Sequence, residues 1–565
     1  MATRVARRSY FPAADWIGKY QKDWLRLDVV AGITAAAVVI PKAMAYATIA
    51  GLPVQVGLYT AFAPMIIYAL LGTSRVLSVS TSTTLAILVG AELSEVVPKG
   101  DAAALLSASA ILTLLVGLAL LLASLLRLGF VANFISEPVL TGFKAGIGVV
   151  IVFDQIPKVL GIHFPKGSFT HNLLSLVREL PNTSVATLAV GLVMIALLVG
   201  LEHFSPRAPA PLIAVAVGIA GAGLLGLQAH GVELVGRIPK GFPPLIRPEL
   251  SLAGRLWPGA LAIALMSFTE TIAAGRAFAR SGEPTPQANQ ELLATGFANA
   301  GGAFLGAMPA GGGTTQTAVN RQAGARTQMS ELVTAGVTLI TMLLLSPVLA
   351  LMPEATLAAV VIVYSMGLIK PKEFSAILRI RRVEFIWAVV ALAGVVALGT
   401  LKGIVMAILV SLIALAHQTA NPPVYPLGRK PGTNFFRPRS EDHPEDEIFP
   451  GLLLVRLEGR IFFLNAAHIG EKIRLLVEET TPKIVVLDLS GVFDLEYTAL
   501  NMLIEGEKAQ RERGISLWLV GLNPAVLEMI QRSSLGASLG RERMHFTLEL
   551  AVERYRASAI TEPVL

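Results

Sequence analysis

The chain has no cysteine and few charged residues for its length. Charged side chains make up 15% of its 565 residues, whereas soluble proteins average roughly 25%. The absence of cysteine excludes a disulfide framework, a thiolate nucleophile and a Cys-ligated metal site. The sequence also lacks a Walker A loop, a nucleophile–base set and metal-ligand spacing among its eight histidines. We therefore predict neither an enzyme nor a protein with a bound cofactor.

Apolar residues, in contrast, are abundant. They make up 54% of the chain, and the mean hydropathy is +0.65. About 20 consecutive apolar residues are enough to cross a bilayer. Seven such stretches lie near 28–49, 56–72, 79–93, 103–127, 134–153, 184–202 and 209–227. Seven more lie near 257–278, 290–308, 314–325, 329–352, 355–368, 384–400 and 402–418. The sequence thus predicts an α-helical polytopic membrane protein with about fourteen spans.

Two of these spans are short and begin in polar or glycine-rich sequence. One break covers residues 78–84, and the other covers residues 309–317 with three consecutive glycines. Irregular backbone at membrane depth is tolerated only where it is buried in protein or lines a cavity. Each break opens the third span of its set of seven, which favours a 7+7 inverted repeat. Such paired breaks indicate a transporter with a substrate site near the bilayer midplane.

The breaks predict an anion site, because helix N-termini carry free N–H groups and a partial positive charge. Five hydroxyl side chains would add hydrogen-bond donors: Ser80, Ser82, Thr83, Thr314 and Thr315. Gly312 and Gly313 would let the backbone approach the anion closely. Helix capping or interhelical hydrogen bonding would explain any single one of these hydroxyls equally well.

Charge is divided unevenly along the chain. Residues 1–439 carry 33 Lys and Arg against 19 Asp and Glu, whereas residues 440–565 carry 13 against 20. The basic residues of the first part lie in residues 1–25 and in short inter-helix loops, so we expect both termini to be cytoplasmic and the protein to lie in the cell (inner) membrane. Residues 1–25 lack the pattern of a cleaved signal peptide. A nucleic-acid partner is not predicted, because the lipid bilayer accounts for this charge pattern.

A second domain follows the membrane segment. A transmembrane domain at 26–420 is predicted to end in a Pro- and charge-rich linker at 421–447. Buried strands are then predicted at 451–457, 484–489 and 515–520, alternating with helices at 465–479, 498–513 and 523–534. This alternation predicts a small cytoplasmic α/β domain at 448–556, followed by a tail at 557–565.

Several motifs resemble the sulfate permease (SulP) family of sulfate–anion solute carriers. The first set comprises Asp28-x-x-Ala31-Gly32-Ile33-Thr34, Ile40-Pro41, Met44-Ala45-Tyr46-Ala47, Ala50-Gly51-Leu52-Pro53 and Gly57-Leu58-Tyr59. The second set comprises Asn289-Gln290-Glu291-Leu292, Thr317-Ala318-Val319-Asn320 and Gly324-Ala325-Arg326-Thr327. The segment 486–492 is similar to a STAS domain, the module of sulfate transporters and anti-sigma factor antagonists. The resemblance extends from about residue 20 to residue 555.

The resemblance implies core and gate domains, a homodimer, and elevator-type alternating access with an anion between two half-helix N-termini. Sulfate carried by proton-coupled symport is the leading function. A bicarbonate or dicarboxylate transporter coupled to Na⁺ or H⁺, and an anion exchanger, remain open. A nucleobase permease shares the repeat architecture but not the STAS tail. A membrane signalling protein with a STAS output would not need a paired site.

Two positions depart from the pattern of the family. Many members carry Gln after the first-span proline, where this chain has Lys42, and many carry Ser-Arg where it has Thr315-Gln316. We hypothesise that Lys42 supplies the positive charge of the missing arginine, since a cation inside an apolar span usually faces a cavity. Lys42 could instead snorkel or pair with an acidic neighbour. Tyr46 and Gln316, on the same two segments, complete the predicted substrate-binding set.

Glu270 is the acidic residue of a predicted core span. Family members often have an acidic residue here that is linked to cation coupling. Burial and a nearby anion both disfavour an ionised carboxyl group, so proton binding and anion binding would help each other. Glu270 therefore predicts proton coupling, with Na⁺ binding or a structural ion pair with Lys42 as the alternatives.

Overall fold

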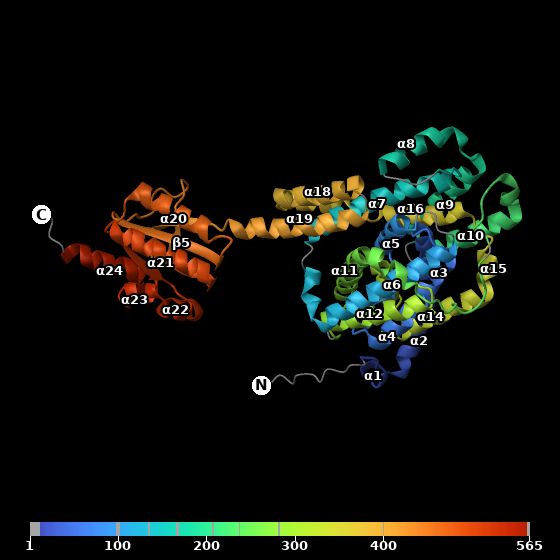
Figure 1. The fold of residues 1–565 in the computed structure, drawn as a ribbon, viewed down its shortest axis with the longest axis horizontal. Helices are drawn as coiled ribbons and strands as arrows, with labels where there is room; N and C mark the ends of the chain where they lie inside the picture. Colours follow the sequence, from blue (N-terminus) through green and yellow to red (C-terminus); the bar gives the residue numbers. More distant parts are fainter. Residues whose placement is uncertain are drawn as a thin grey trace. The chain divides into compact units, whose positions relative to one another are not determined.

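The computed structural model describes residues 12–97, 102–133, 136–164, 169–205, 208–236, 238–280, 283–398 and 400–561. The chain forms two compact units, Met1–Ser411 and Leu412–Leu565 (Figure 1). The first unit is helical, and the second combines a sheet with helices. This division agrees with the predicted fold class, a polytopic helical protein with a small α/β domain.

The helices of the first unit follow the predicted order. Its first half contains α1 (Pro12–Ile17), α2 (Lys22–Ile49), α3 (Val54–Thr60), α4 (Ala63–Leu71), α5 (Thr83–Val96), α6 (Ala102–Leu125), α7 (Glu137–Leu160), α8 (Phe169–Glu179), α9 (Val185–Phe204) and α10 (Ala210–Leu225). Its second half contains α11 (Ala253–Ala277), α12 (Ala288–Phe304), α13 (Thr314–Gln322), α14 (Met329–Ile340), α15 (Ser346–Leu349), α16 (Glu354–Met366), α17 (Pro371–Ile380) and α18 (Arg382–Leu398), and α19 (Thr400–Ala420) runs across the boundary between the two units. A π-helical turn at Thr341–Leu345 joins α14 to α15 just before Pro347, which lacks the N–H that a regular α-helix needs.

The two halves match in the order of their elements. A short helix, α5 or α13, takes the third place among the predicted spans of each half, and an amphipathic surface helix, α8 or α17, follows the fifth. In the described part of the chain, eight helical segments are long and apolar enough to cross a membrane, so the first unit is an integral membrane domain. The total of fourteen spans stays a prediction. Helix α7 corresponds to the fifth predicted span, at 134–153, but its end differs. It continues to Leu160, where Gly161 in the left-handed region ends it.

Close helix contacts depend on small residues. A Cβ atom at Gly117 of α6 would lie 2.6 Å from the backbone nitrogen of Ala300 on α12. A Cβ at Gly142 of α7 would lie 1.9 Å from the carbonyl oxygen of Ala388 on α18. Because apolar side chains gain little by leaving lipid for another helix, backbone approach of this kind is what holds membrane helices together.

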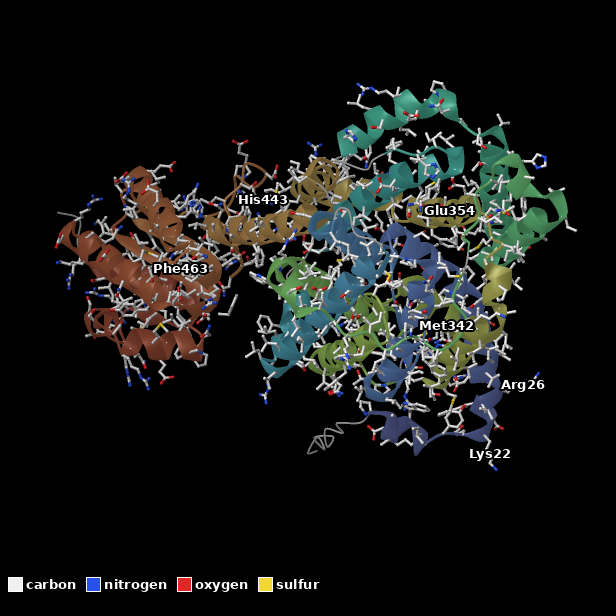
Figure 2. The ribbon with its side chains drawn as sticks, turned by 45° about the vertical axis from the view of Figure 1, so that its right-hand side comes forward. Lys22, Arg26, Met342, Glu354, His443 and Phe463 are labelled. Atoms are coloured by element: carbon white, nitrogen blue, oxygen red, sulfur yellow. The ribbon has the colours of Figure 1, made fainter. Side chains whose placement is uncertain are left out.

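The interior and the ends of the first unit differ in polarity. Lys22 and Arg26 are exposed at the beginning of α2, where Figure 2 shows them at the edge of the unit. Met342, in the π-helical turn, is buried among the helices. A helix with a basic end and an apolar body is the pattern expected for a span that emerges near the headgroups.

A two-stranded crossing connects the halves at the centre of the first unit. Strand β1 (Val79–Ser80) pairs antiparallel with β2 (Gly311–Gly312), and Val79 lies opposite Gly312. A Cβ at Gly312 would lie 2.7 Å from the Cα of Thr271 on α11, so glycine is needed for the fit. Each strand leads directly into a half-helix, and the crossing therefore holds the N-termini of α5 and α13 close together.

The second unit is built on one mixed sheet. Its elements are β3 (Val424–Arg429), β4 (Phe436–Pro438), β5 (Leu452–Ile461), α20 (Ala466–Thr480), β6 (Ile484–Leu495), α21 (Tyr497–Glu512), β7 (Ser516–Val520), α22 (Pro524–Gln531), α23 (Ser534–Leu539), β8 (Met544–His545) and α24 (Leu548–Thr561). The strand order is β4-β3-β5-β6-β7-β8, in which β5 to β8 are parallel and β3 and β4 are antiparallel additions. The predicted strands and helices of the α/β domain are all present.

The sheet is apolar on both faces. Leu453 and Val455 of β5 pack with the helices α20 to α23, whereas their neighbours Leu452 and Leu454 pack with α24 on the other face. Alternate residues of a strand point to opposite faces, so a strand covered on both sides is apolar throughout. This is why the strand could be predicted from its continuous apolar run.

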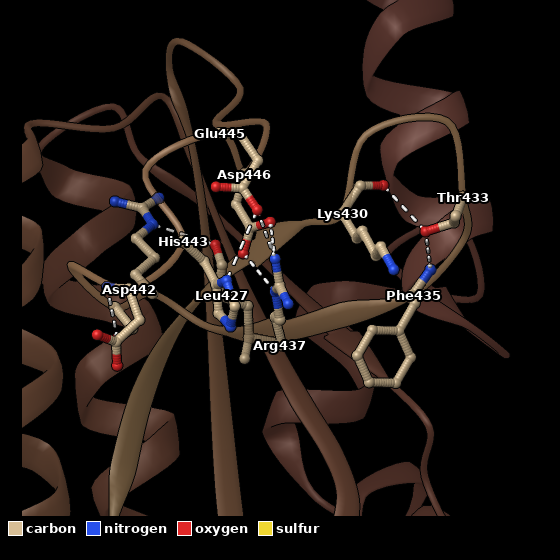
Figure 3. Close-up of polar contacts among 11 residues, drawn as sticks. Leu427, Lys430, Thr433, Phe435, Arg437, Asp442, His443, Glu445 and Asp446 are labelled. Atoms are coloured by element: carbon tan, nitrogen blue, oxygen red, sulfur yellow. Dashed lines mark hydrogen bonds and ion pairs between the residues drawn. The ribbon is translucent and has the colours of Figure 1, made fainter.

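Strands β3 and β4 lie inside the stretch predicted as a linker, and the sequence pattern missed them. A polar network fixes the loop that follows them (Figure 3). Arg437 Nε and Nη2 donate to the two carboxylate oxygens of Asp446, both at 2.8 Å, and Nη2 also donates to Glu445 at 3.1 Å. These bonds from Arg437 hold the pKa of Asp446 below its usual value. The boundaries of the domains, the linker and the tail stay predictions.

Candidate functional site

The predicted site residues gather around one cavity of about 640 Å³ in the first unit. Its lining residues come from two groups of elements, α2, α5, α11 and α13, and α7, α9, α16 and α17. Of the predicted residues, those in the lining are Lys42, Tyr46, Ser82, Thr83, Glu270, Gly312, Gly313, Thr314, Thr315 and Gln316. Ser80 is not among the lining residues of this cavity.

The N-terminus of α5 is capped by its own side chain. Ser82 is the N-cap residue, and its Oγ accepts a hydrogen bond from the Leu85 backbone N–H at 3.2 Å. The same hydroxyl donates to Glu270 Oε2 at 2.7 Å. The next residues, Thr83 and Thr84, are buried. Ser82 therefore uses its oxygen as a cap and its proton to hold Glu270 in the cavity wall.

The N-terminus of α13 has no side-chain cap. Its N-cap residue is Gly313, whose own N–H donates to the Ser78 carbonyl at 3.0 Å. Thr314 and Thr315 follow and are exposed to the cavity. The first N–H groups of a helix have no partner within the helix. The first turn of α13 therefore presents free donors and a positive dipole end to whatever occupies the cavity.

Ser80 and Gln316 bind each other across the crossing. Gln316 Nε2 donates to Ser80 Oγ at 2.9 Å and to the Ser78 carbonyl at 3.2 Å. The Gln316 side chain thus lines the cavity but directs its amide donor toward β1. Ser80 is fully buried behind this contact.

Lys42 is a buried cation without a hydrogen-bond partner among the described residues. Its side chain is 2% exposed, and its Nζ lies 3.5 Å from the centre of the Tyr364 ring. Aromatic rings attract cations through their electron-rich faces, so Tyr364 partly compensates the charge. Tyr46 lies one helical turn further along α2, on the same side. No ion pair joins Lys42 to Glu270 in the described part of the chain.

Several cavity residues were not predicted as site residues. The ring of Tyr364, on α16, lies 3.5 Å from Lys42 Nζ, and Glu202 of α9 and Lys144 of α7 are further charged residues of the lining. Lys370 and Glu373, at the start of α17, form an ion pair of 2.7 Å at the cavity edge. Glu202 stands at the end of an apolar run, which is the one sequence signal that could have identified it.

The cavity is therefore not uniformly positive. Its lining carries three lysines and four glutamates, namely Lys42, Lys144, Lys370, Glu137, Glu202, Glu270 and Glu373. The summed charge of these seven side chains would not favour an anion over a cation. The local groups at this cavity that favour negative charge are the open N-terminus of α13 and Lys42 Nζ, which has no hydrogen-bond partner among the described residues.

Comparisons with known proteins find relatives over nearly the whole chain. The model of the Sulfate permease family matches residues 25–391, and that of the STAS domain matches residues 443–551. The "Probable sulfate transporter Rv1739c" of Mycobacterium tuberculosis is 33% identical over 561 residues, which cover 98% of this chain and 100% of that protein. The "Probable sulfate transporter 3.4" of Arabidopsis thaliana is 30% identical and covers 96% of this chain and 87% of its own length.

Two solved structures share the fold. The murine Slc26a9 anion transporter in its inward-facing state has a TM-score of 0.89 and 22% identity, covering 99% of this chain and 96% of that one. The transmembrane domain of the cyanobacterial bicarbonate transporter BicA has a TM-score of 0.58 and 24% identity, covering 70% of this chain and 98% of that one. At these identities the likeness concerns the fold alone.

Proposed function

This chain belongs to the sulfate permease family of anion transporters, and from that premise we propose that it carries sulfate by proton-coupled symport. The observation that carries the proposal is the pairing of two positive groups at one cavity. The uncapped N-terminus of α13 and the unpartnered Nζ of Lys42 both meet the same space. Curated relatives named sulfate transporters match the full length of the chain and support sulfate as the substrate.

Lys42 takes the role of the fixed positive charge in this proposal. An ammonium group held by an aromatic face keeps its donors available, because a ring does not accept hydrogen bonds as strongly as a carboxylate does. A divalent oxyanion between Lys42 and the first turn of α13 would satisfy both. We therefore expect Lys42, and not Gln316, to replace the arginine found in many family members.

Glu270 supplies the coupling. An ionised carboxylate in the cavity wall repels a doubly charged anion, whereas a protonated one does not. Proton binding and sulfate binding therefore favour each other, which is the thermodynamic requirement for symport. The bond from Ser82 fixes Glu270 at the N-terminus of α5, in the lining of the cavity that we propose holds the anion.

We further propose alternating access by movement of one part of the cavity lining against the other. We assign α2, α5, α11 and α13 to a core that carries the anion, and α7, α9, α16 and α17 to a gate. An elevator movement of the core against the gate would expose the site to each side in turn. In this proposal the protein is a homodimer in the cell (inner) membrane, with both termini and the STAS domain in the cytoplasm.

Uptake of labelled sulfate into proteoliposomes tests the function. We expect sulfate uptake to be stimulated when the interior is alkaline, and bicarbonate, fumarate and chloride to compete weakly. Flux of one competitor without sulfate flux would change the substrate but not the site. Absence of flux for every anion would favour the signalling function instead.

Two variants separate binding from coupling. Lys42→Gln should weaken sulfate binding at least about tenfold, the equivalent of roughly 1.4 kcal/mol. Wild-type affinity and rate in this variant would remove Lys42 from the site. Glu270→Gln should bind sulfate but exchange it without a response to the pH gradient. Concentrative, pH-driven uptake by Glu270→Gln would contradict proton coupling through this residue.

A further inference from the structure

A second buried carboxyl group lies outside the cavity. Glu331 of α14 is fully buried, yet it is absent from the cavity lining. Its Oε1 accepts a hydrogen bond from Asn320 Nδ2 of α13 at 3.0 Å. Its Oε2 has no hydrogen-bond partner, and no Lys, Arg or His forms an ion pair with it among the described residues. Neither the anion site nor Glu270 accounts for this group.

Two further oxygen atoms at the same place lack partners. Asn320 Oδ1 and Ser78 Oγ are fully buried and have no hydrogen-bond partner in the described part of the chain. Asn320 contacts Glu331 directly, and the Ser78 side chain lies near the Glu331 carboxyl group without a hydrogen bond of regular geometry to it. Three segments thus converge here: the first residue of the break, directly before β1, the half-helix α13 and the start of α14.

The chemistry of these atoms indicates the kind of ligand. A carboxylate oxygen and an amide oxygen can only accept hydrogen bonds. The Ser78 hydroxyl has a single proton, so it can donate to only one of these two acceptors. Unsatisfied buried acceptors are unfavourable, and an unpaired buried carboxylate more so. A hard cation binds oxygen atoms of all three kinds at once. One carboxylate among neutral oxygens balances a single positive charge, whereas a divalent ion would leave a net charge in the interior.

We propose that Glu331, Asn320 and Ser78 form a Na⁺ site behind the crossing of β1 and β2. The ion would bind Glu331 Oε2, Asn320 Oδ1 and Ser78 Oγ, on the far side of the half-helices from the anion. The site is separate from Glu270, which is held by Ser82 in the cavity wall.

The position of Ser78 connects this site to the anion. The Ser78 carbonyl accepts hydrogen bonds from the Gly313 N–H at 3.0 Å and from Gln316 Nε2 at 3.2 Å. The Ser78 N–H donates to Thr317 Oγ1 at 3.1 Å. A cation on Ser78 Oγ would therefore fix the N-terminus of α13, the element that presents free donors to the anion. Na⁺ and the anion should strengthen each other's binding by the same factor. Only this coupling between Na⁺ and the anion rests on the proposed function.

Thermal unfolding of the purified full chain in detergent, without sulfate, tests the site directly. Melting temperatures are compared in NaCl, KCl and choline chloride at equal ionic strength. We expect a saturable rise in Tm with NaCl alone. Glu331→Gln should abolish the rise, because its amide group provides the missing donor and no charge. Ser78→Ala should weaken the rise, and it serves as the second variant if Glu331→Gln does not fold.

Glu270→Gln is the matched control, since it makes the same chemical change on the other side of the crossing. It should keep the Na⁺-dependent rise. Loss of the rise in Glu270→Gln, with retention in Glu331→Gln, would place the cation in the cavity and overturn the inference. A wild-type protein that responds equally to K⁺, or to neither ion, would overturn it too. A Na⁺ response without sulfate uptake would reject the proposed function and leave this site standing.

Discussion

The half-helices α5 and α13 occupy matching places in the two halves, but their N-termini differ. In α5 the cap is Ser82, whose hydroxyl bonds both Leu85 N–H and Glu270. In α13 the cap position is Gly313, without a side chain to satisfy the first turn. Both helix ends line the cavity, but Thr83 and Thr84 after the cap of α5 are buried, whereas Thr314 and Thr315 of α13 are exposed. The two helix N-termini at matching positions thus differ in whether a side chain caps them.

This difference suggests a division of labour. In the first half, Ser82 caps α5 and Glu270 lies beside the helix end. The positive dipole end of α5 is therefore already partly neutralised. The second half leaves its helix end open, and Lys42 lines the same cavity without a hydrogen-bond partner among the described residues. We infer that α13 provides most of the donors for the anion, whereas α5 provides the link to the proton. Each of the following variants alters one side of this comparison.

The largest effect is expected at the strand pair that joins the two half-helices. In Gly312→Ala the new Cβ would meet the Cα of Thr271 at 2.7 Å, and backbone cannot yield as a side chain does. Overpacking of this kind costs about 1–3 kcal/mol and would displace the start of α13. Sulfate uptake should fall by at least about tenfold. Gly336→Ala, at a glycine of α14 with open space around it, should transport normally. Normal uptake by Gly312→Ala would show that the crossing does not set the geometry of the site.

The next largest effect is expected from proline variants, which compare the N-termini of α13 and α5 directly. Proline at the first helical position removes one N–H and is compatible with a helix there. Thr314→Pro should weaken sulfate binding by about tenfold or more, since a hydrogen bond to a charged group contributes about 1.5–3 kcal/mol. Thr83→Pro should weaken it less, because that end is buried, capped and next to Glu270. Binding is measured by isotope competition on the purified protein.

Alanine variants at the same two positions complete that test. Thr314→Ala and Thr83→Ala remove the hydroxyl groups and keep the N–H groups, so they separate the two kinds of donor. If Thr83→Pro weakens binding as much as Thr314→Pro does, the two helix ends share the anion equally and the asymmetry has no functional meaning.

Much of this arrangement could be predicted from local sequence. Ser82 before a run of apolar residues indicates a capped helix start, and the three glycines at 311–313 indicate a close backbone approach. Lys42 and Glu270 stand out because charges are rare in apolar spans. In the second unit, apolar runs revealed the central strands because both faces of the sheet are covered.

The features that could not be predicted depend on contacts between segments that are distant in the sequence. Tyr364 is one aromatic residue in an apolar helix, and only the fold places its ring over Lys42. Strands β3 and β4 lie in a Pro-rich stretch and gain their order by pairing with β5. The open end of α13 could be foreseen, whereas the burial of Ser80 behind Gln316 could not, because that bond joins residues 236 positions apart.

A smaller effect is expected from removal of the cap of α5. Ser82→Ala loses the bond from Leu85 N–H and the bond to Glu270, and should lower the stability of the fold by about 0.5–2 kcal/mol. Because α5 contributes fewer donors, sulfate affinity should change little, while the dependence of uptake on the pH gradient should weaken. Ser94→Ala, at an exposed serine of the same helix, is the control and should leave both properties unchanged. A large loss of affinity in Ser82→Ala would indicate that its hydroxyl binds the anion instead of capping the helix.

The smallest effect on binding is expected at Gln316, where the structure directs the amide donor to β1 rather than into the cavity. Gln316→Ala would remove the bonds to Ser80 Oγ and the Ser78 carbonyl and leave both buried groups without that donor. The melting temperature should therefore fall, by an amount that corresponds to about 1–3 kcal/mol. Sulfate affinity should remain within roughly threefold of wild type, since less than about 0.7 kcal/mol of binding would be lost. The opposite pattern, an unchanged melting temperature with tenfold weaker binding, would mean that Gln316 turns its amide to the anion, as the family's arginine position suggests. The second half would then bind the anion through a side chain as well as through its open helix end.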